Sequence, residues 1–489
     1  MNMKKVLAFD FGASSGRAML GTYADSKIKI DEIHRFENIP VEKEGTLYWD
    51  LEAILKEIKT ALKKAGDIDS IAFDTWGVDF GLIGEDGKLL ENPVHYRDAR
   101  TNGIFGYAFG RMPKDRLYER TGNQIMEINT LFQLASLIRD GSEKLNRAKC
   151  LLMMPDLFNY LLSGVKSTEI SIASTTQMMD TVQRRWSDEI LESFGIPRIL
   201  TDIHETGTVV GTLSDEICSE LGIGKAKIIS VASHDTQSAI ASVPACEKDF
   251  IYVSCGTWSL FGTEIARPII NEKSAAYNLT NEIGTENTYD FMKNIIGLWL
   301  IQESRRQWKR EGRDYSYAEL EKLALDCAPL KCFIDPDAPE FVAPGDIPGR
   351  VREFCRRTGQ YVPQSVGEVM RCIYESIAMK YHAAYDEIKD CTGKAYDAIH
   401  IVGGGTKDGL LCQMTANSCG CIVYAGPVEA TVLGNVAVQL IALGEIDSVT
   451  EARRIISGSE KILEFTPIGH QIWNEKYSIF KNIIKTEVR

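Results

Sequence analysis

Near its N-terminus the chain reads VLAFDFGASSGRAML (residues 6–20), and this stretch decides the fold. Its apolar start predicts a buried strand over residues 6–9. The small residues 12–16 predict a tight turn, and a second apolar strand is expected over 18–20. Because the turn joins two strands, it cannot be a dinucleotide-binding turn, which must open a helix. It also lacks the GxxxxGK[ST] pattern of a P-loop.

Outward from this hairpin, the pattern predicts a third strand over 28–36, a helix from Asp50 to about Gly66, and a strand over 71–73. A similar order returns later in the chain. Strands are expected over 250–253 and 258–262 around a turn at 254–257. A long helix then begins with a capping box at Ser365 and Glu368, and a strand over 399–402 runs into three glycines at 403–405.

This repeated order predicts an α/β protein that arose by duplication. At 489 residues the chain is long enough for two substantial domains. We expect an N-terminal domain over 1–245 and a C-terminal domain over 246–489. Two such domains facing each other would place their small-residue turns across one cleft, where ligands often bind.

The charge balance argues against nucleic-acid partners. Lys and Arg number 55 against 68 Asp and Glu, so the net charge is −13, whereas nucleic-acid binders carry basic patches. The apolar run after Met1 is too short for a signal-peptide core. No stretch approaches the ~18 uncharged apolar residues of a membrane span. We therefore expect a cytoplasmic protein with no membrane partner, either a monomer or a small homo-oligomer.

The twelve cysteines are expected to be reduced and mostly buried, as in other cytoplasmic chains. Cys412, Cys419 and Cys421 lie close in sequence, which is compatible with a metal site. No histidine or carboxylate stands at ligand spacing beside them, so buried thiols are the preferred interpretation.

The first chemical motif is Asp10 with the turn that follows it. A carboxylate at the end of a buried strand can hold Mg²⁺, through water because that ion sheds its hydration shell reluctantly. Small residues let backbone N–H groups approach phosphate, and an arginine adds charge. An ordinary hairpin turn remains the alternative. The phosphate-binding candidates are Ala13, Ser14, Ser15, Gly16 and Arg17.

The second motif is Ser233-His234-Asp235-Thr236, which follows an apolar strand. Adjacent residues cannot form a nucleophile–base–orienter relay, which needs side chains from separated positions. A single aspartate fits better as the base for a hydroxyl in phosphoryl transfer. A helix N-cap at Asp235 is the competing interpretation.

Two further segments carry glycines beside polar or aromatic residues. Residues 74–79 read DTWGVD, in which carboxylates, a tryptophan and Gly77 could bind a sugar, or the tryptophan could simply be buried. The three glycines at 403–405 follow a strand and favour close approach of a nucleotide, with a sharp loop as the alternative.

Together these motifs resemble the FGGY carbohydrate kinases, within the actin, hexokinase and heat-shock ATPase superfamily. The resemblance covers nearly the whole chain. Besides the motifs above, it rests on the segments YRDARTN (96–102), MPD (154–156), GTWS (256–259), KN (293–294), GLW (297–299) and AGPVEA (425–430).

The resemblance implies two ribonuclease-H-like domains of the actin and hexokinase type, with a cleft between them. It implies ATP and Mg²⁺ as cofactors and a small ketose, L-rhamnulose, phosphorylated at its 1-hydroxyl. L-fuculose and L-ribulose remain alternatives. Many family members have Thr where Ala13 stands, and this departure agrees with the L-rhamnulose branch. The implied ATP-binding residues are 13–17 with Thr257, Gln302 and Gly404. The implied sugar-binding residues are Gly77, His234, Asp235, Thr236 and Asn294, with Asp235 as the catalytic base.

An actin-like ATPase that acts as a chaperone, filament or sensor would share the phosphate turns. It would not require Asp235 or the segment around Gly77, and these residues therefore favour the kinase.

Overall fold

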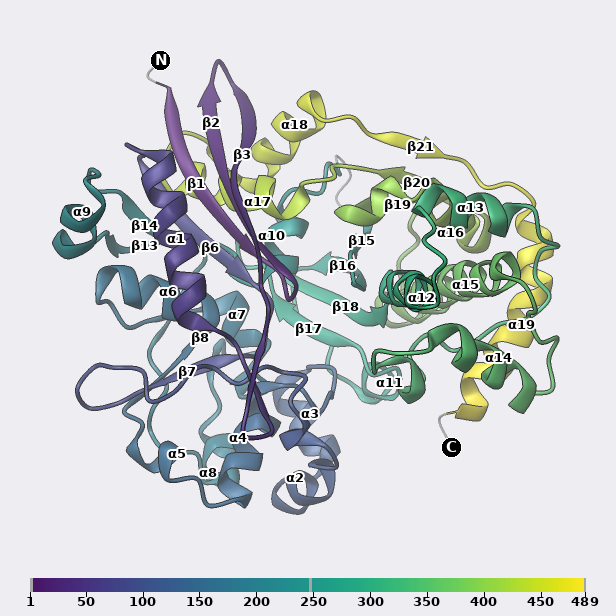
Figure 1. The fold of residues 1–489 in the computed structure, drawn as a ribbon, viewed down its shortest axis with the longest axis horizontal. Coiled ribbons are helices and arrows are strands. Elements are labelled where there is room, and N and C mark those ends of the chain that lie inside the picture. The colour runs from purple at the N-terminus through teal and green to yellow at the C-terminus, as the bar shows by residue number, and fades with distance from the viewer. Residues whose placement is uncertain (1–2, 246–248, 488–489) are drawn as a thin grey trace. The chain divides into compact units, whose positions relative to one another are not determined.

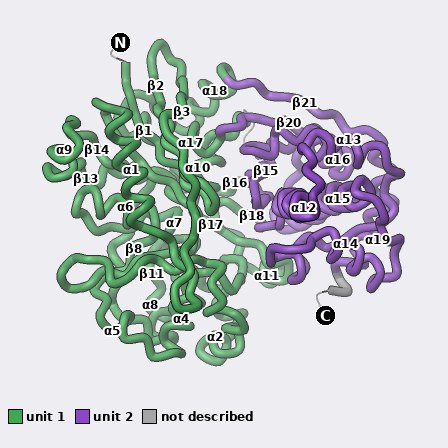
Figure 2. Tube along the Cα trace, in the orientation of Figure 1, with its two compact units in different colours: residues 1–246, 264–291, 430–459 green, residues 247–263, 292–429, 460–489 purple. Residues whose placement is uncertain are grey.

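The computed structural model describes residues 3–245 and 249–487 and consists of two compact units (Figures 1 and 2). Unit 1 comprises Met1–Cys246, Glu264–Phe291 and Ala430–Ser459, and unit 2 comprises Glu247–Thr263, Met292–Glu429 and Glu460–Arg489. Most of the predicted boundary near residues 245–248 lies outside the described residues. The domain limits of 1–245 and 246–489 stay a prediction.

Unit 1 is built on a six-stranded sheet of order β13-β14-β6-β1-β2-β3. Strand β1 is antiparallel to β2 and parallel to β6, and β6 is parallel to β14. The strands are β1 (Lys4–Phe11), β2 (Ser15–Ala24), β3 (Lys27–Glu37), β6 (Ser70–Thr75), β13 (Thr208–Thr212) and β14 (Lys227–Ser230).

The remaining elements of unit 1 are short strands and α-helices, with one 3-10 helix (Ala99–Thr101). The strands are β4 (Val41–Lys43), β5 (Thr46–Tyr48), β7 (Phe80–Ile83), β8 (Cys150–Met153), β9 (Thr168–Glu169), β10 (Met179–Asp180), β11 (Arg185–Trp186), β12 (Ile203–His204) and β17 (Thr280–Ile283). The helices are α1 (Leu51–Ala65), α2 (Phe105–Arg111), α3 (Lys114–Thr121), α4 (Thr130–Arg139), α5 (Glu143–Arg147), α6 (Met154–Ser163), α7 (Ile170–Ser174), α8 (Asp188–Phe194), α9 (Asp215–Leu221), α10 (Asp235–Ala241), α11 (Glu272–Ala276), α17 (Ala430–Ala442) and α18 (Val449–Ser459).

Unit 2 is built on a second sheet, which contains the neighbouring strands β18-β16-β15-β19-β20-β21 in this order. The strands are β15 (Ile251–Cys255), β16 (Trp258–Ile265), β18 (Tyr289–Ile296), β19 (Ala398–Val402), β20 (Ile422–Ala425) and β21 (Leu463–Phe465). The helices are α12 (Trp299–Arg310), α13 (Tyr317–Leu325), α14 (Ile347–Arg357), α15 (Val366–Thr392), α16 (Gly409–Cys419) and α19 (His470–Glu487).

The two sheets share one topology around their central strands. Strand β15 is antiparallel to β16 and parallel to β19, as β1 is to β2 and β6. Strand β20 then continues in parallel beside β19, as β14 does beside β6. The predicted α/β class and the repeated order are therefore confirmed at the level of strand pairing.

Strand β1 is buried on both faces, and its side chains alternate between two clusters. Phe9 belongs to a cluster with α1 and α6, and its ring stacks on Phe73 of β6 at 4.6 Å. Val6 and Ala8 belong to the opposite cluster, which is completed by α17. The continuous apolar run at the N-terminus is the sequence signature of this two-sided burial.

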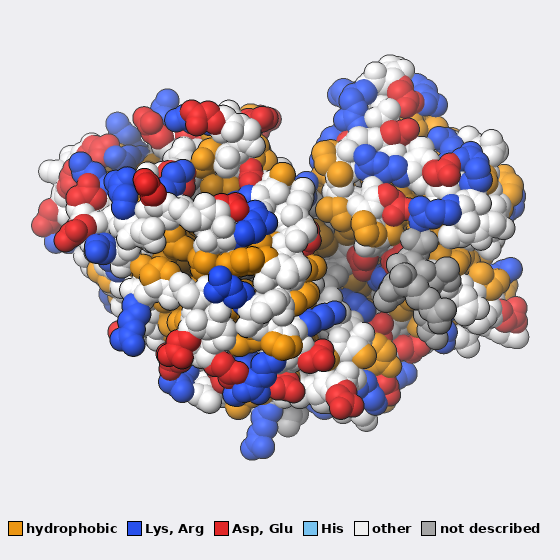
Figure 3. Space-filling model, turned by 90° about the horizontal axis from the view of Figure 1, so that it is seen from below, with side chains coloured by type: hydrophobic (Ala, Val, Ile, Leu, Met, Phe, Trp, Pro, Cys, Tyr) orange, Lys and Arg blue, Asp and Glu red, His pale blue; other side chains and the backbone are white. Residues whose placement is uncertain are grey.

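Local signals set the ends of the predicted helices. The Asp50 side chain accepts a hydrogen bond from Ala53 N at 3.1 Å and begins α1, which ends at Gly66 with φ of 68°. The capping box of Ser365 and Glu368 is present at the start of α15. Among the described residues no helix is both long enough and apolar enough to cross a membrane. On the face drawn in Figure 3, acidic and basic side chains are interspersed.

Helix α17 packs closely on α10, the helix that starts at Asp235. A Cβ atom on Gly434 of α17 would lie 1.7 Å from the Ser238 carbonyl oxygen of α10. We expect Gly434→Ala to push the two helices apart and to lower the free energy of unfolding by about 1–3 kcal/mol. Calorimetry would show this as a lower unfolding temperature.

Gly458→Ala is the matched control, because a Cβ at this position of α18 meets nothing within 4 Å. There the substitution should leave stability unchanged or raise it by up to ~1 kcal/mol, through helix propensity alone. Equal unfolding temperatures for the two variants would contradict the packing argument.

Candidate active site

The turn between β1 and β2 is held from one side and open on the other. Asn38 donates its Nδ2–H to the Gly12 carbonyl at 3.2 Å, and its backbone N–H bonds to the Ser14 carbonyl at 3.1 Å. A Cβ on Gly16 would lie 2.2 Å from the Phe36 ring, so this position accepts only glycine. Ser14 at the tip is exposed. The predicted phosphate turn therefore has a rigid base and an accessible tip.

Three polar residues from adjacent strands lie on one face of the sheet beside this turn. Asp10 of β1 is opposite Arg17 of β2 and opposite Asp74 of β6, and opposed residues point to the same face. Arg17 donates to the Asp10 carboxylate. Asn435 of α17 donates its Nδ2–H to Asp74 Oδ2 at 2.6 Å. Complete burial, reinforced by the charge of Asp10, raises the pKa of Asp74 well above its ordinary range.

Asp235 is the first helical residue of α10, and His234 occupies the N-cap position. The interpretation of Asp235 as the N-cap is therefore wrong. The start of the helix is fixed beside β6, because Thr75 N–H donates to the Ser233 carbonyl at 2.9 Å. The side chain of Asp235 is 33% exposed. Burial raises its pKa, the neighbouring His234 opposes this change, and Asp10 adds to it. Asp235 is thus a solvent-accessible carboxylate with increased basicity.

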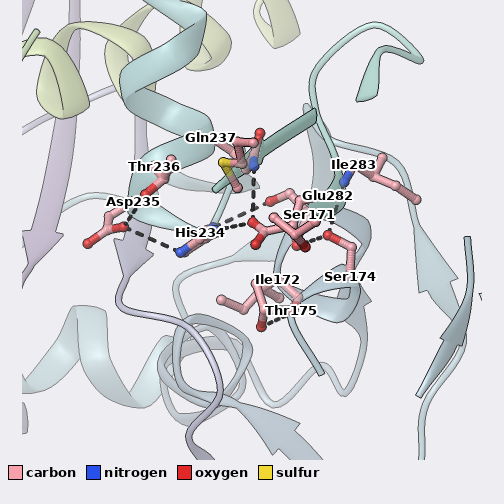
Figure 4. Close-up of polar contacts among 12 residues, drawn as sticks. Ser171, Ile172, Ser174, Thr175, His234, Asp235, Thr236, Gln237, Glu282 and Ile283 are labelled. Atoms are coloured by element: carbon pink, nitrogen blue, oxygen red, sulfur yellow. Dashed lines mark hydrogen bonds and ion pairs between the residues drawn. The ribbon is translucent and has the colours of Figure 1, made fainter. Parts of the chain in front are cut away.

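A buried glutamate from β17 holds His234 (Figure 4). His234 Nδ1 lies 2.8 Å from Glu282 Oε2, and Gln237 donates its Nε2–H to the same oxygen at 3.2 Å. On the other side of the ring, His234 Nε2 lies 3.6 Å from Asp235 Oδ1. Burial alone would lower the pKa of His234, but the charge and hydrogen bond of Glu282 raise it above the ordinary value. His234 thus lies between two carboxyl groups, those of Glu282 and Asp235.

The backbone of this loop is also fixed by α7 and the residue before it. Ser233 N–H donates to Glu169 Oε2 at 3.2 Å, and His234 N–H donates to Ser171 Oγ at 3.3 Å. Ser171 in turn donates its hydroxyl to Glu169 Oε2 at 2.5 Å. The backbone on the N-terminal side of Asp235 is therefore anchored, and the Asp235 carboxylate itself accepts a hydrogen bond from Thr236 Oγ1 at 3.2 Å.

The segment around Gly77 is shaped by a buried aspartate. Asp79 Oδ2 accepts from Trp49 Nε1 at 2.7 Å and from Trp76 Nε1 at 2.9 Å. Burial raises the pKa of Asp79 to about 6, against the effect of these donors. A Cβ on Gly77 would lie 3.2 Å from Thr175 Oγ1, and the next residue, Val78, has φ of 69°. Asp79 thus orients the indoles, and its oxygens bind protein donors.

Two candidate residues of unit 2, Thr257 and Gly404, follow the ends of its central strands β15 and β19. Thr257 is in the β15–β16 turn, which is closed by a hydrogen bond from Gly256 N–H to the Trp258 carbonyl at 2.8 Å. Gly404 is exposed, and a Cβ there meets nothing within 4 Å. On Gly405 a Cβ would lie 2.1 Å from Cys255 Sγ. Gln302 on α12 and Asn294 on β18 are both half-buried.

Comparisons with known proteins agree with this architecture. The model for the N-terminal domain of the FGGY family of carbohydrate kinases matches residues 5–242, and the C-terminal model matches 251–443. The chain belongs to the FGGY family of carbohydrate kinases.

Relatives of this FGGY kinase include a rhamnulokinase of Bacteroides thetaiotaomicron, 40% identical over 98% of the chain and 99% of the relative. A rhamnulokinase of Halalkalibacterium halodurans is 40% identical over 94% and 97%. Among solved structures, a xylulose kinase of Lactobacillus acidophilus has a TM-score of 0.82 at 18% identity, covering 99% of this chain and 98% of the other. Glycerol kinase of Plasmodium falciparum with ADP has a TM-score of 0.79 at 15% identity, covering 100% and 99%. The structural likenesses establish the two-domain α/β fold.

In this FGGY kinase, unit 1 brings together Asp10, the turn at 13–17 and the loop at 234–236, because β1 pairs with β6, whose last residue, Thr75, bridges to His234. Gly77 lies in the same unit. Thr257, Asn294, Gln302 and Gly404 belong to unit 2. The roles of all these residues stay predictions. Sequence reasoning missed Glu282 and Asn435, which contact residues 48 and 361 positions away and belong to no local motif.

The charge of Glu282 can be tested separately from its hydrogen bond. Glu282→Gln keeps an acceptor for His234 Nδ1–H but removes the charge. We expect the pKa of His234, measured by NMR, to fall below its ordinary value because the effect of burial remains. A raised folded-state pKa contributes stability at low pH that is lost as pH rises through that pKa. The difference in unfolding free energy between wild type and variant should therefore narrow with rising pH.

Glu272→Gln, on the surface of α11 in the same unit, is the control and should leave the His234 titration unchanged. A His234 pKa that stays the same in Glu282→Gln would show that the glutamate does not set the charge of the histidine.

Proposed function

We propose that this carbohydrate kinase transfers the γ-phosphoryl group of ATP to the 1-hydroxyl of L-rhamnulose, giving L-rhamnulose 1-phosphate and ADP. The single observation that carries the chemical step is Asp235, an accessible carboxylate of raised pKa among anchored neighbours. The choice of sugar is supported by the similarity to rhamnulokinases over nearly the full chain.

On the sugar side, we assign Gly77, His234, Asp235, Thr236 and Asn294 to the ketose. His234 can donate its Nε2–H to a sugar oxygen while its Nδ1–H is donated to the Glu282 carboxylate. Asp235 orients the attacking hydroxyl and accepts its proton as the new phosphorus–oxygen bond forms. Phosphoryl transfer has a loose transition state, so a carboxylate of modest basicity is sufficient for this role.

On the nucleotide side, we assign residues 13–17, Thr257, Gln302 and Gly404 to ATP. An exposed glycine next to a strand lets a ligand approach the backbone closely. The accessible tip of the β1–β2 turn offers hydroxyls and backbone N–H groups of the kind that bind phosphate. The domain limits of 1–245 and 246–489 belong to this proposal.

Magnesium fits the donors present near the turn. Asp10 and Asp74 supply oxygen atoms, which this hard cation prefers, and Asp74 Oδ1 is buried with no hydrogen-bond partner in the described part of the chain. We assign Asp10 to the ion, through a water molecule. When bound, the ion would neutralise charge on the phosphates, while Arg17 and the backbone of the turn position them.

Two alternatives keep part of this assignment. A kinase for L-fuculose or L-ribulose would use the same base and differ only in sugar contacts. An actin-like ATPase would use the phosphate turns without needing an anchored base.

Asp235→Asn tests the base directly. We expect kcat to fall by roughly 10²–10⁴-fold or more, because the amide cannot accept the proton. The free energy of unfolding of the variant should not be lower than that of wild type. Burial and the charge of Asp10 destabilise the ionised Asp235 in the folded state, and the substitution removes this effect. This destabilising contribution grows as pH rises through the folded-state pKa, so the stability gained by the variant should be larger at neutral than at acidic pH. Coupled ADP release and calorimetry provide the two measurements.

Asp215→Asn is the matched control. Asp215 is also the first residue of a seven-residue helix, but its side chain is 87% exposed. The Asp215→Asn variant should retain the full activity of the wild type. A kcat for Asp235→Asn within a few fold of wild type would refute the assignment of the base.

A panel of ketoses tests the substrate. ADP release should require sugar, and kcat/KM should be highest for L-rhamnulose among L-rhamnulose, L-fuculose, L-ribulose and D-xylulose. ADP release at the same rate without sugar would favour the ATPase alternative. A higher kcat/KM for another ketose would overturn the choice of sugar and leave the kinase assignment intact.

A further inference from the structure

Unit 2 contains a cluster of three buried cysteines that no motif in the sequence indicates. Cys332, Cys355 and Cys372 are at most 4% exposed, and their three Sγ atoms all lie within 4.8 Å of one another. Cys332 is on the loop that follows α13, Cys355 on α14, and Cys372 on α15. We call these residues the three-thiol cluster. It is the only set of three or more metal-ligating groups at such distances among the residues that the structure describes.

The loop that carries Cys332 is fixed on both sides of the cysteine. Leu330 N–H donates to Glu375 Oε2 at 2.8 Å, and Ile334 N–H donates to Ser376 Oγ at 2.9 Å, both on α15. Gln360 makes a pair of 2.8 Å hydrogen bonds with the backbone of Phe333. Cys332 is thereby held against the helix that carries Cys372, and the thiols are brought together by contacts that do not involve sulfur.

A small cavity lies on one side of the cluster. Cys332 and Cys372 line it together with Lys331, Tyr361, Arg371 and Glu375. Arg371 is oriented by a 2.6 Å bond to Glu375 Oε1. Its lining thus carries two cations, Lys331 and Arg371, and two carboxylates, Glu368 and Glu375, that pair with them.

Three sulfurs in this arrangement favour soft metal ions. Thiolates select Cu⁺, Zn²⁺ and similar ions, whereas Mg²⁺ and Ca²⁺ take oxygen ligands. Zinc–sulfur bonds are ~2.3 Å long, so three sulfurs around one ion lie about 4 Å apart. The separations in the cluster, all within 4.8 Å, require at most a small movement of the thiols to reach this spacing. A closed structural zinc site has four protein ligands, whereas this cluster offers three. An ion bound here would therefore keep one coordination position open.

We propose that the three-thiol cluster is a binding site for a single thiophilic d¹⁰ cation, held by three thiolates with its remaining coordination position toward the cavity. Each thiol loses its proton on binding, so a divalent ion leaves a complex of net charge −1. The site is separate from the residues assigned to sugar and ATP, and the proposal does not depend on the proposed function.

Cadmium is the probe, because its thiolate complexes absorb in the ultraviolet. The full-length protein is reduced, stripped of metal under anaerobic conditions and titrated with Cd²⁺. We expect a thiolate-to-metal band that saturates at one equivalent, and a cadmium NMR shift typical of three sulfur ligands. Zn²⁺ should compete for the same site and raise the unfolding temperature.

Cys332→Ser and Cys355→Ser should each abolish the stoichiometric band. Cys150→Ser, which removes another buried free cysteine, should retain it. The NMR measurement uses the wild-type protein, so the proposal can be tested even if a variant fails to fold. The proposal is overturned if no stoichiometric band forms or if Cys332→Ser binds Cd²⁺ like wild type. It is also overturned if two of the three thiols are found joined in a disulfide after reduction and anaerobic handling.

Discussion

The two-sided burial of β1 is the constraint on which unit 1 depends. One face of the strand packs on α1 and α6, and the other on α17, so a shift of one residue would exchange every side chain between the faces. The register fixed in this way places Asp10 opposite Arg17 and Asp74. The polar end of the sheet is therefore a consequence of how its apolar part packs.

The same register places carboxyl groups close together in a buried environment, which destabilises their ionised forms. Asp74 and Asp235 both have raised pKa values because burial and the nearby charge of Asp10 disfavour their ionised forms. For Asp74, a hydrogen bond from Asn435 offsets part of this cost. Asp235 accepts a hydrogen bond from the Thr236 hydroxyl at 3.2 Å and also lies beside His234, whose pKa is raised by Glu282. Destabilised carboxylates of this kind are common where a protein needs a base.

Much of the fold and part of the site could be predicted, because their signals are local. The β1–β2 turn, the cap at Asp50 and the capping box at Ser365 each involve residues within a few positions. Contacts between distant segments left no such pattern. The cysteines singled out in the sequence were neighbours in the chain, whereas the three that cluster come from α14, α15 and a separate loop. Likewise, nothing near Glu282 indicates that it binds His234.

The duplicated topology places different residues at equivalent positions of the two sheets. Residues DFGA (10–13) in unit 1 and SCGT (254–257) in unit 2 occupy equivalent turns, and each is closed by a hydrogen bond from the glycine N–H. Asp10 is paired with Asp74 on the parallel strand, whereas Ser254 is paired with Val402. Three glycines then follow Val402. Carboxylates suit proton transfer and metal binding but repel a polyphosphate, whereas glycines and hydroxyls present neutral donors to it. This difference supports the proposal that the base lies in unit 1 and that Thr257 and Gly404 of unit 2 contact the nucleotide.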